Sequence, residues 1–126
     1  MKNTIDWFEI PTRDLDKATR FYETVLGTAI RREVYGGSPH GVLVAPEDAV
    51  SGALVVADDK RKPGATGALI YLACRDGVPA VVERAEKAGA AVVLPVTSIG
   101  PFGWIAVIRD LDGNEIGLHA EAAAVG

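Results

Sequence analysis

The chain has 126 residues, of which 48% are hydrophobic and 24% are charged, which excludes a disordered or fibrous protein and fits one folded domain. Thirteen Lys and Arg against seventeen Asp and Glu give a net charge of -4, so a nucleic-acid partner is not expected. The sequence has neither an apolar run long enough to span a membrane nor an N-terminal signal pattern, which predicts a cytoplasmic protein with no membrane partner.

The first half of the chain predicts a strand, a helix and three further strands. Segment 5–10 is apolar and β-prone, and Pro11 is expected to end it because proline has no N–H to donate. Asp14 can cap a helix with apolar residues at helical spacing, and Gly27 can end it in a left-handed conformation. Short runs between turn-forming residues complete the half, which predicts a helix over 15–26, a turn over 36–39 and strands over 29–35, 41–45 and 52–57.

The second half repeats this order after the charged segment 58–65, which contains Pro63 and Gly64 and predicts a linker. A gapless shift of 62 residues places Arg13-Asp14 on Arg75-Asp76 and Gly27 on Gly89. The repeat predicts a helix over 78–88 and strands over 67–74, 91–98, 103–109 and 115–120. A single domain over 1–126 is therefore expected, with module 1 at 4–57, the linker at 58–65, module 2 at 66–120 and a tail at 121–126.

Side chains alternate between the two faces of a strand, so each predicted strand divides into two sets. One set is aliphatic or Phe, as with Phe8 and Ile10, and is expected to pack beneath the helices. The other set combines apolar walls with a few polar groups, which is typical of a small-molecule pocket. This candidate ligand-binding set comprises Trp7, Glu9, Val55, Leu69, Tyr71, Gly117 and His119, together with Trp104 from a neighbouring strand. The alternative is an exposed sheet face with ordinary polar side chains.

Glu9 and His119 are the candidate catalytic residues. A carboxylate on an inward face must be hydrogen-bonded or have a raised pKa. A carboxylate with a raised pKa can act as a general base. In that hypothesis His119 is the partner of Glu9 and Tyr71 is a hydroxyl donor. In the alternative hypothesis Glu9 pairs structurally with an arginine such as Arg109 or Arg32.

The two βαβββ modules, the opening WFEIPTRDLDKATRFYETVLG and the closing DLDGNEIGLH resemble the vicinal oxygen chelate superfamily. Its members include glyoxalase I, bleomycin resistance proteins and extradiol dioxygenases. The resemblance covers nearly the whole chain and implies an α+β fold whose two modules curl a mixed sheet into a cup. It also implies a small-molecule partner and a second chain, and the open strand edges likewise favour a homodimer.

Metal enzymes of this superfamily place four ligands on the floor of the cup, at positions that correspond here to Trp7, Val55, Leu69 and Gly117. None of these residues can bind a metal through its side chain, so no metal and no cofactor is predicted. A relocated metal site would need two His and a carboxylate, and the candidate ligands are His40, His119 and Glu9. His40 follows Pro39 in the predicted turn, where a solvated side chain is expected.

The sequence thus predicts a small-molecule-binding protein of this superfamily without its usual metal site, and it specifies no particular ligand. The alternative is an enzyme. It would be a lyase, an isomerase or a dioxygenase with relocated metal ligands, or a metal-free acid/base catalyst that uses Glu9 and His119.

Overall fold

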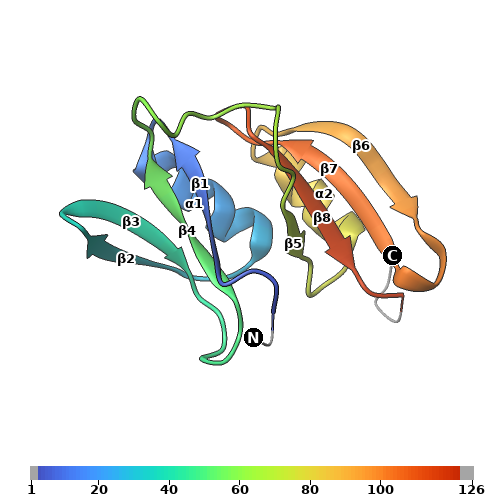
Figure 1. Ribbon diagram of the computed structural model, residues 1–126. Helices are drawn as coiled ribbons and strands as arrows, with labels where there is room; N and C mark the ends of the chain where they lie inside the picture. Colours follow the sequence, from blue (N-terminus) through green and yellow to red (C-terminus); the bar gives the residue numbers. More distant parts are fainter. Residues whose placement is uncertain (1–2, 123–126) are drawn as a thin grey trace. The chain divides into compact units, whose positions relative to one another are not determined.

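The computed structural model describes residues 3–122, which form two α-helices and eight strands in two open, mixed four-stranded sheets (Figure 1). Contacts divide the chain into two compact units, with the border between Pro63 and Gly64 inside the predicted linker. Residues Thr24–Leu26 group with the second unit. Each half has the order βαβββ, which confirms the predicted α+β fold of two tandem modules. Of the predicted tail, residues 123–126 lie outside the described part of the chain.

Module 1 is a sheet of strand order β1-β4-β3-β2, in which only the β1 and β4 pair is parallel. Helix α1 begins and ends where the sequence predicts, because the Asp14 side chain accepts a hydrogen bond from the backbone N–H of Lys17 and Gly27 adopts a φ of 67°. The elements are β1 (Trp7–Thr12), α1 (Leu15–Leu26), β2 (Ile30–Tyr35), β3 (Ser38–Leu43) and β4 (Ser51–Val56).

Two boundaries in module 1 differ from the prediction. Strand β1 continues through Pro11, which an edge strand tolerates because its outer side donates no ladder bonds. The predicted turn is shorter than expected because Gly36 and Gly37 both have positive φ, 58° and 77°, and form a two-residue hairpin. Strand β3 therefore starts at Ser38, and the prediction that His40 lies in a solvated turn is wrong.

Module 2 is a sheet of strand order β5-β8-β7-β6, with the β5 and β8 pair parallel. Strand β5 is shorter than the predicted 67–74, and Gly67, at the start of that range, has a φ of 93°, which is outside the strand region. Leu69 thus precedes the strand. The elements are β5 (Tyr71–Ala73), α2 (Val78–Lys87), β6 (Ala91–Ser98), a 3₁₀ turn (Gly100–Phe102), β7 (Trp104–Arg109) and β8 (Glu115–Ala120).

Each helix packs on one face of the sheet in its own module (Figure 1). In module 1 this face carries Ile10, Leu54 and Gly41, and a Cβ on Gly41 would lie 3.6 Å from Leu15 Cδ1 of α1. In module 2 the apolar residues Val78, Val81, Val82 and Ala85 of α2 are buried, as are Leu72 and Leu118 of the sheet. Each large side chain buried in this way stabilises the fold by about 1.5 to 3 kcal/mol.

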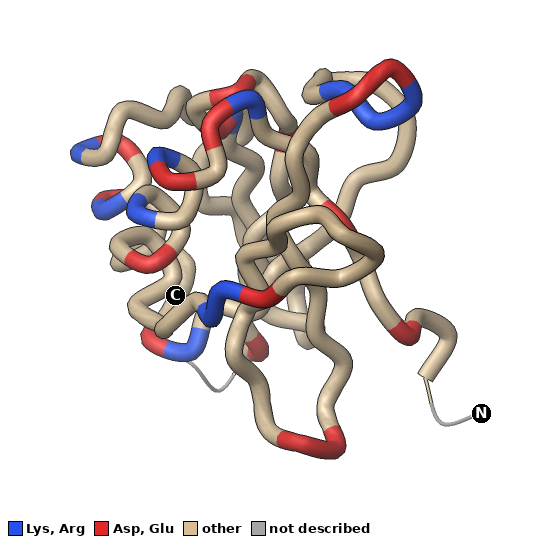
Figure 2. Tube along the Cα trace, turned by 90° about the vertical axis from the view of Figure 1, so that its left-hand side faces the viewer, with Lys and Arg blue, Asp and Glu red and all other residues tan. Residues whose placement is uncertain are grey.

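Basic and acidic residues alternate in short stretches along the described chain (Figure 2). Within the linker, Asp58 accepts hydrogen bonds from the backbone N–H groups of Lys60 and Arg61, which lowers the pKa of its carboxyl group. None of the helices in the described range has the length and apolar character needed to cross a membrane.

Cys74, at the end of β5, gives a direct test of core burial. Its side chain is buried, and this burial raises the pKa of the thiol to about 11. Because only the thiolate reacts rapidly, we expect almost no reaction of the folded protein with a disulfide reagent at about pH 8, and complete reaction in denaturant. Rapid labelling of the folded protein would contradict this packing of module 2.

Candidate functional site

The candidate site lies on the face of the module 1 sheet that points away from α1. Strand pairing sets Glu9 beside Ala53, and His40 beside Val55, so all four side chains share this face. Val42, Ala53 and Val55 form a buried apolar cluster here, which we call the floor. Trp7 and Glu9 on β1 and His40 on β3 stand on opposite sides of β4 around this floor. A largely apolar surface with a few polar groups is the composition of a small-molecule site.

The polar groups beside the floor contact one another. Trp7 Nε1 donates a hydrogen bond of 3.3 Å to Glu9 Oε2, and the same oxygen lies 3.8 Å from His40 Nε2. His40 Nδ1 lies 2.9 Å from the carbonyl oxygen of Ser38. A carbonyl oxygen only accepts, so Nδ1 carries the hydrogen and Nε2 of the neutral ring is an acceptor. The His40 side chain is 11% exposed and that of Glu9 is 38% exposed, so solvent reaches the pair from the Glu9 side.

Strand β2 completes this face with Arg31, Glu33 and Tyr35. The ring of Tyr35 stands edge-on to that of His40, with centroids 5.0 Å apart, and restricts its orientation. Hydrogen bonds from Arg31 to Glu33 and to Tyr35 raise the pKa of the guanidinium group. The charge of Arg31 is thus balanced by Glu33 within β2. The carboxylate of Glu9 therefore stays available to contact a ligand.

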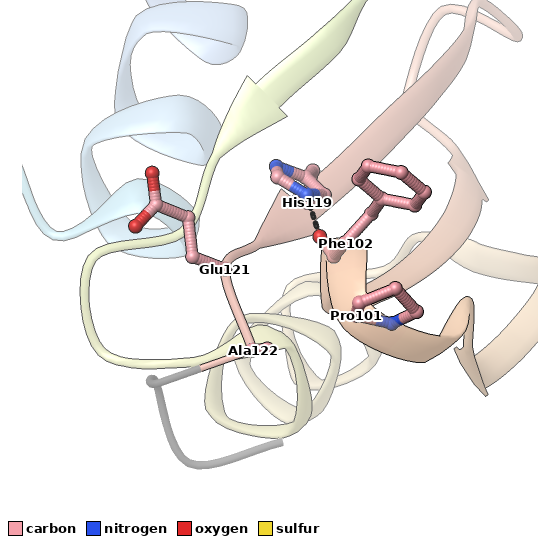
Figure 3. A pocket seen from close by; sticks show the side chains of 5 residues that line it. All are labelled: Pro101, Phe102, His119, Glu121 and Ala122. Atoms are coloured by element: carbon pink, nitrogen blue, oxygen red, sulfur yellow. Dashed lines mark hydrogen bonds between the residues drawn. The ribbon is translucent and has the colours of Figure 1, made fainter.

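In module 2, Tyr71, Gly117 and His119 share one sheet face. A Cβ on Gly117 would lie 2.5 Å from Cδ1 of Tyr71, so the Tyr71 ring covers Gly117 directly. His119 Nε2 lies 2.8 Å from the carbonyl oxygen of Phe102, and both residues line an open pocket of about 460 Å³ (Figure 3). Its remaining lining residues are Pro101, Glu121 and Ala122.

Trp104 lies on the other face of the module 2 sheet. It pairs with Ala120, and therefore alternates with Ile105, the residue opposite His119. The reason is that the repeat does not stay gapless: Val42 pairs with Ala53, whereas Gly117, the equivalent of Ala53, pairs with Val107, a shift of 65 rather than 62. The odd difference of three residues reverses the two faces of β7 relative to β3. We therefore leave Trp104 out of the proposed ligand-binding set.

The structure brings Trp7, Glu9 and Val55 together in module 1, and Tyr71, Gly117 and His119 together in module 2. Leu69 belongs to module 2 and is 41% exposed. The Glu9 and His119 partnership joins two units and stays a prediction. The alternative arginine partners of Glu9 are engaged elsewhere, since Arg109 pairs with Glu115 and Arg32 with Asp16.

Sequence reasoning missed His40 as the neighbour of Glu9, and it did not single out Tyr35. The signal that could have found both is Gly36-Gly37, since a two-residue hairpin at this dipeptide sets Tyr35 opposite Ser38 and Glu33 opposite His40. Alternation from Val42 then places His40 on the face of the floor.

The residues at the four positions that correspond to the superfamily's metal ligands do not fit a metal centre. Trp7, Val55, Leu69 and Gly117 offer no side-chain donor, and neither does Ala53, which strand pairing makes equivalent to Gly117. Within residues 3–122, no group of three or more His, Cys, Asp or Glu is placed to hold a metal ion.

Known proteins are similar to this chain over most of its length. Residues 4–118 match the family model described as the Glyoxalase/Bleomycin resistance protein/Dioxygenase superfamily. A crystal structure of a glyoxalase/bleomycin resistance protein from Streptomyces sp. CB03234 is 31% identical, with a TM-score of 0.67 over 90% of this chain and 96% of that one.

Two further relatives carry more specific names. TnmS3, an antibiotic binding protein from Streptomyces sp. CB03234, is 29% identical, with a TM-score of 0.65 over 94% of this chain and 96% of that one. A Mycobacterium tuberculosis protein named "Putative glyoxylase CFP32" is 29% identical over 122 residues, which are 93% of this chain and 45% of that protein. The chain thus spans about half the length of the curated relatives it matches.

Proposed function

Because the chain belongs to the Glyoxalase/Bleomycin resistance protein/Dioxygenase superfamily, we propose that it binds a small organic molecule without using the superfamily's usual metal site. The ligand lies on the floor of module 1 and contacts the indole of Trp7. The observation that carries this proposal is the group of Trp7, Glu9 and His40 around a buried apolar floor. A half-exposed indole stacks on flat ligands, and the carboxylate and imidazole orient them.

Two further observations support the proposal. A relative that is 29% identical over nearly its whole length is named an antibiotic binding protein. At the four positions where metal enzymes of the superfamily hold their ion, this chain has side chains that cannot bind a metal. A role in ligand binding does not require a metal at these positions. The expected homodimer and the cytoplasmic location remain predictions from the sequence.

The alternative is an enzyme. It would be a lyase, isomerase or dioxygenase with relocated ligands, or a metal-free catalyst that uses Glu9 and His119. The proximity of Glu9 to the imidazole of His40, and not of His119, supports acid/base chemistry in module 1, because such a pair can transfer protons between groups of a substrate. A bound compound recovered unchanged after long incubation favours the binding protein, and a chemically altered one favours the enzyme.

Backbone amide spectra of the ¹⁵N-labelled protein, recorded with a library of aromatic fragments in the presence of EDTA, test the proposal. We expect the largest ligand-induced shifts at the amides of Trp7, Glu9, His40 and Val55, because their side chains border the site. A library that moves none of these amides, or moves only amides of α1 and the opposite sheet face, would contradict the proposed site.

A further inference from the structure

The space between Glu9 and His40 carries a further inference, which rests on the proposed function. Oε2 of Glu9 and Nε2 of His40 lie 3.8 Å apart, beyond the range of a direct hydrogen bond. Both atoms are acceptors when the imidazole is neutral, because the contact with Ser38 assigns the ring hydrogen to Nδ1. A donor group with two hydrogens can reach both of these acceptors at once.

The surroundings hold both acceptors in place. The Ser38 carbonyl and the edge-on ring of Tyr35 restrict the His40 imidazole, while Trp7 donates to Glu9 from the solvent side. Ala53 on β4 pairs with Glu9, and its small side chain leaves space above β4 between Glu9 and His40. The neighbouring cation, Arg31, is bound to Glu33 on β2 and does not neutralise Glu9. The titratable groups on this face around His40 are therefore Glu9, Glu33, Arg31 and Tyr35.

We propose that Glu9 and His40 form a double acceptor that selects aromatic ligands with an amino or amidino group. An amino group carries two hydrogens and can donate to both atoms, and the bond to the carboxylate is charge-assisted. An anionic ligand is disfavoured because it would meet Glu9 with like charge. Trp7 and the floor hold the aromatic part of the ligand, and the acceptor pair sets its orientation.

Matched compounds isolate the contribution of the donor. The probes are 2-aminobenzothiazole with 2-methylbenzothiazole, and 2-aminoquinoline with 2-methylquinoline, each titrated at about pH 8 and followed by the amide shifts of module 1. Within each pair the ring is the same and the substituents are similar in size. We expect the amino compound to bind about tenfold more tightly, the difference that one charged hydrogen bond typically makes.

Two variants of the acceptor pair, with one control variant and one replacement, test whether the pair causes this preference. Glu9→Leu and His40→Phe each remove one acceptor and should bring the amino-to-methyl affinity ratio close to one. Glu86→Gln neutralises an exposed carboxylate on α2 and should leave the ratio as in the parent protein. Glu9→Gln, which preserves the side-chain shape, replaces Glu9→Leu if the latter loses its dispersed amide spectrum, and it should lower the ratio severalfold.

The other possible results of these titrations contradict either the double acceptor or the ligand site itself. Equal affinities within both pairs, or a preference that survives loss of Glu9 and of His40, would overturn the double acceptor while leaving a ligand site on this face. Equal affinities are the result expected if the two acceptors bind only a water molecule and not the amino group of the ligand. If neither these probes nor the fragment library shifts the amides of the face, the proposed function itself fails.

Discussion

Replacing Gly103 with alanine is expected to lower the free energy of unfolding by about 3 kcal/mol, the sum of a backbone and a packing penalty. Gly103 has a φ of 110°, which a residue with a Cβ adopts only under strain, and the added Cβ would overlap the carbonyl oxygen of Ala120. Backbone atoms of β8 cannot move aside without breaking its ladder. Gly103 also closes the 3₁₀ turn, since its N–H donates to the carbonyl of Gly100 at 3.2 Å and its own carbonyl accepts the N–H of Ile99 at 2.8 Å.

Two other glycines separate the backbone penalty from the steric one. Gly67 has a φ of 93° with open space around it, so Gly67→Ala should cost about 1 kcal/mol. Gly64 has open space and no positive φ, so Gly64→Ala should change stability by a few tenths of a kcal/mol, roughly the neutral case. Urea unfolding curves measure all three. A Gly103→Ala protein no less stable than Gly67→Ala would show that β8 does not approach this turn closely.

Trp7→Ala is expected to weaken binding of aromatic fragments to module 1 about tenfold, equivalent to about 1.4 kcal/mol. The indole supplies a stacking surface and the N–H that contacts Glu9, and alanine supplies neither. Because Trp7 is 41% exposed, its loss should change the unfolding free energy much less than the affinity. Fragment titrations followed by amide shifts, with a urea curve for each variant, measure the two effects.

Val56→Ala is the matched control for Trp7→Ala. Val56 is similarly exposed, at 44%, but it belongs to the alternate set of β4, which shares the sheet face packed against α1. Its truncation should leave fragment affinity unchanged. Equal losses of affinity in the two variants would indicate that exposed apolar area in general, and not this face of module 1, binds the fragments.

The fold could be predicted from the sequence because its signals are local and the order of elements occurs twice, although Asp76, the equivalent of Asp14, does not cap α2. Asp14 and Gly27 define α1 through capping chemistry, and the same order of elements recurs in the second half. The start of β3 was missed because it depends on the conformations of Gly36 and Gly37, which decide whether the following residues turn or extend. At the start of the predicted strand 67–74, Gly67 likewise has a positive φ, which the sequence does not reveal.

The candidate site was predictable only in part. Alternation along a strand correctly groups Trp7 with Glu9, because it requires no knowledge of strand pairing. Identifying His40 as the neighbour of Glu9 requires the order β1-β4-β3 and the register across it. The position of Trp104 likewise depends on a three-residue shift between β3 and β7, which a gapless repeat cannot reveal.

The central claim, ligand binding on module 1 without a metal, is tested most directly by the metal content of the purified protein together with fragment affinity before and after chelation. The protein is prepared without a tag or chelator, and zinc, iron, manganese, nickel and cobalt are measured per chain. We predict metal far below one ion per chain and unchanged affinity after EDTA treatment. Near-stoichiometric metal whose removal abolishes binding would contradict the account and would indicate relocated ligands.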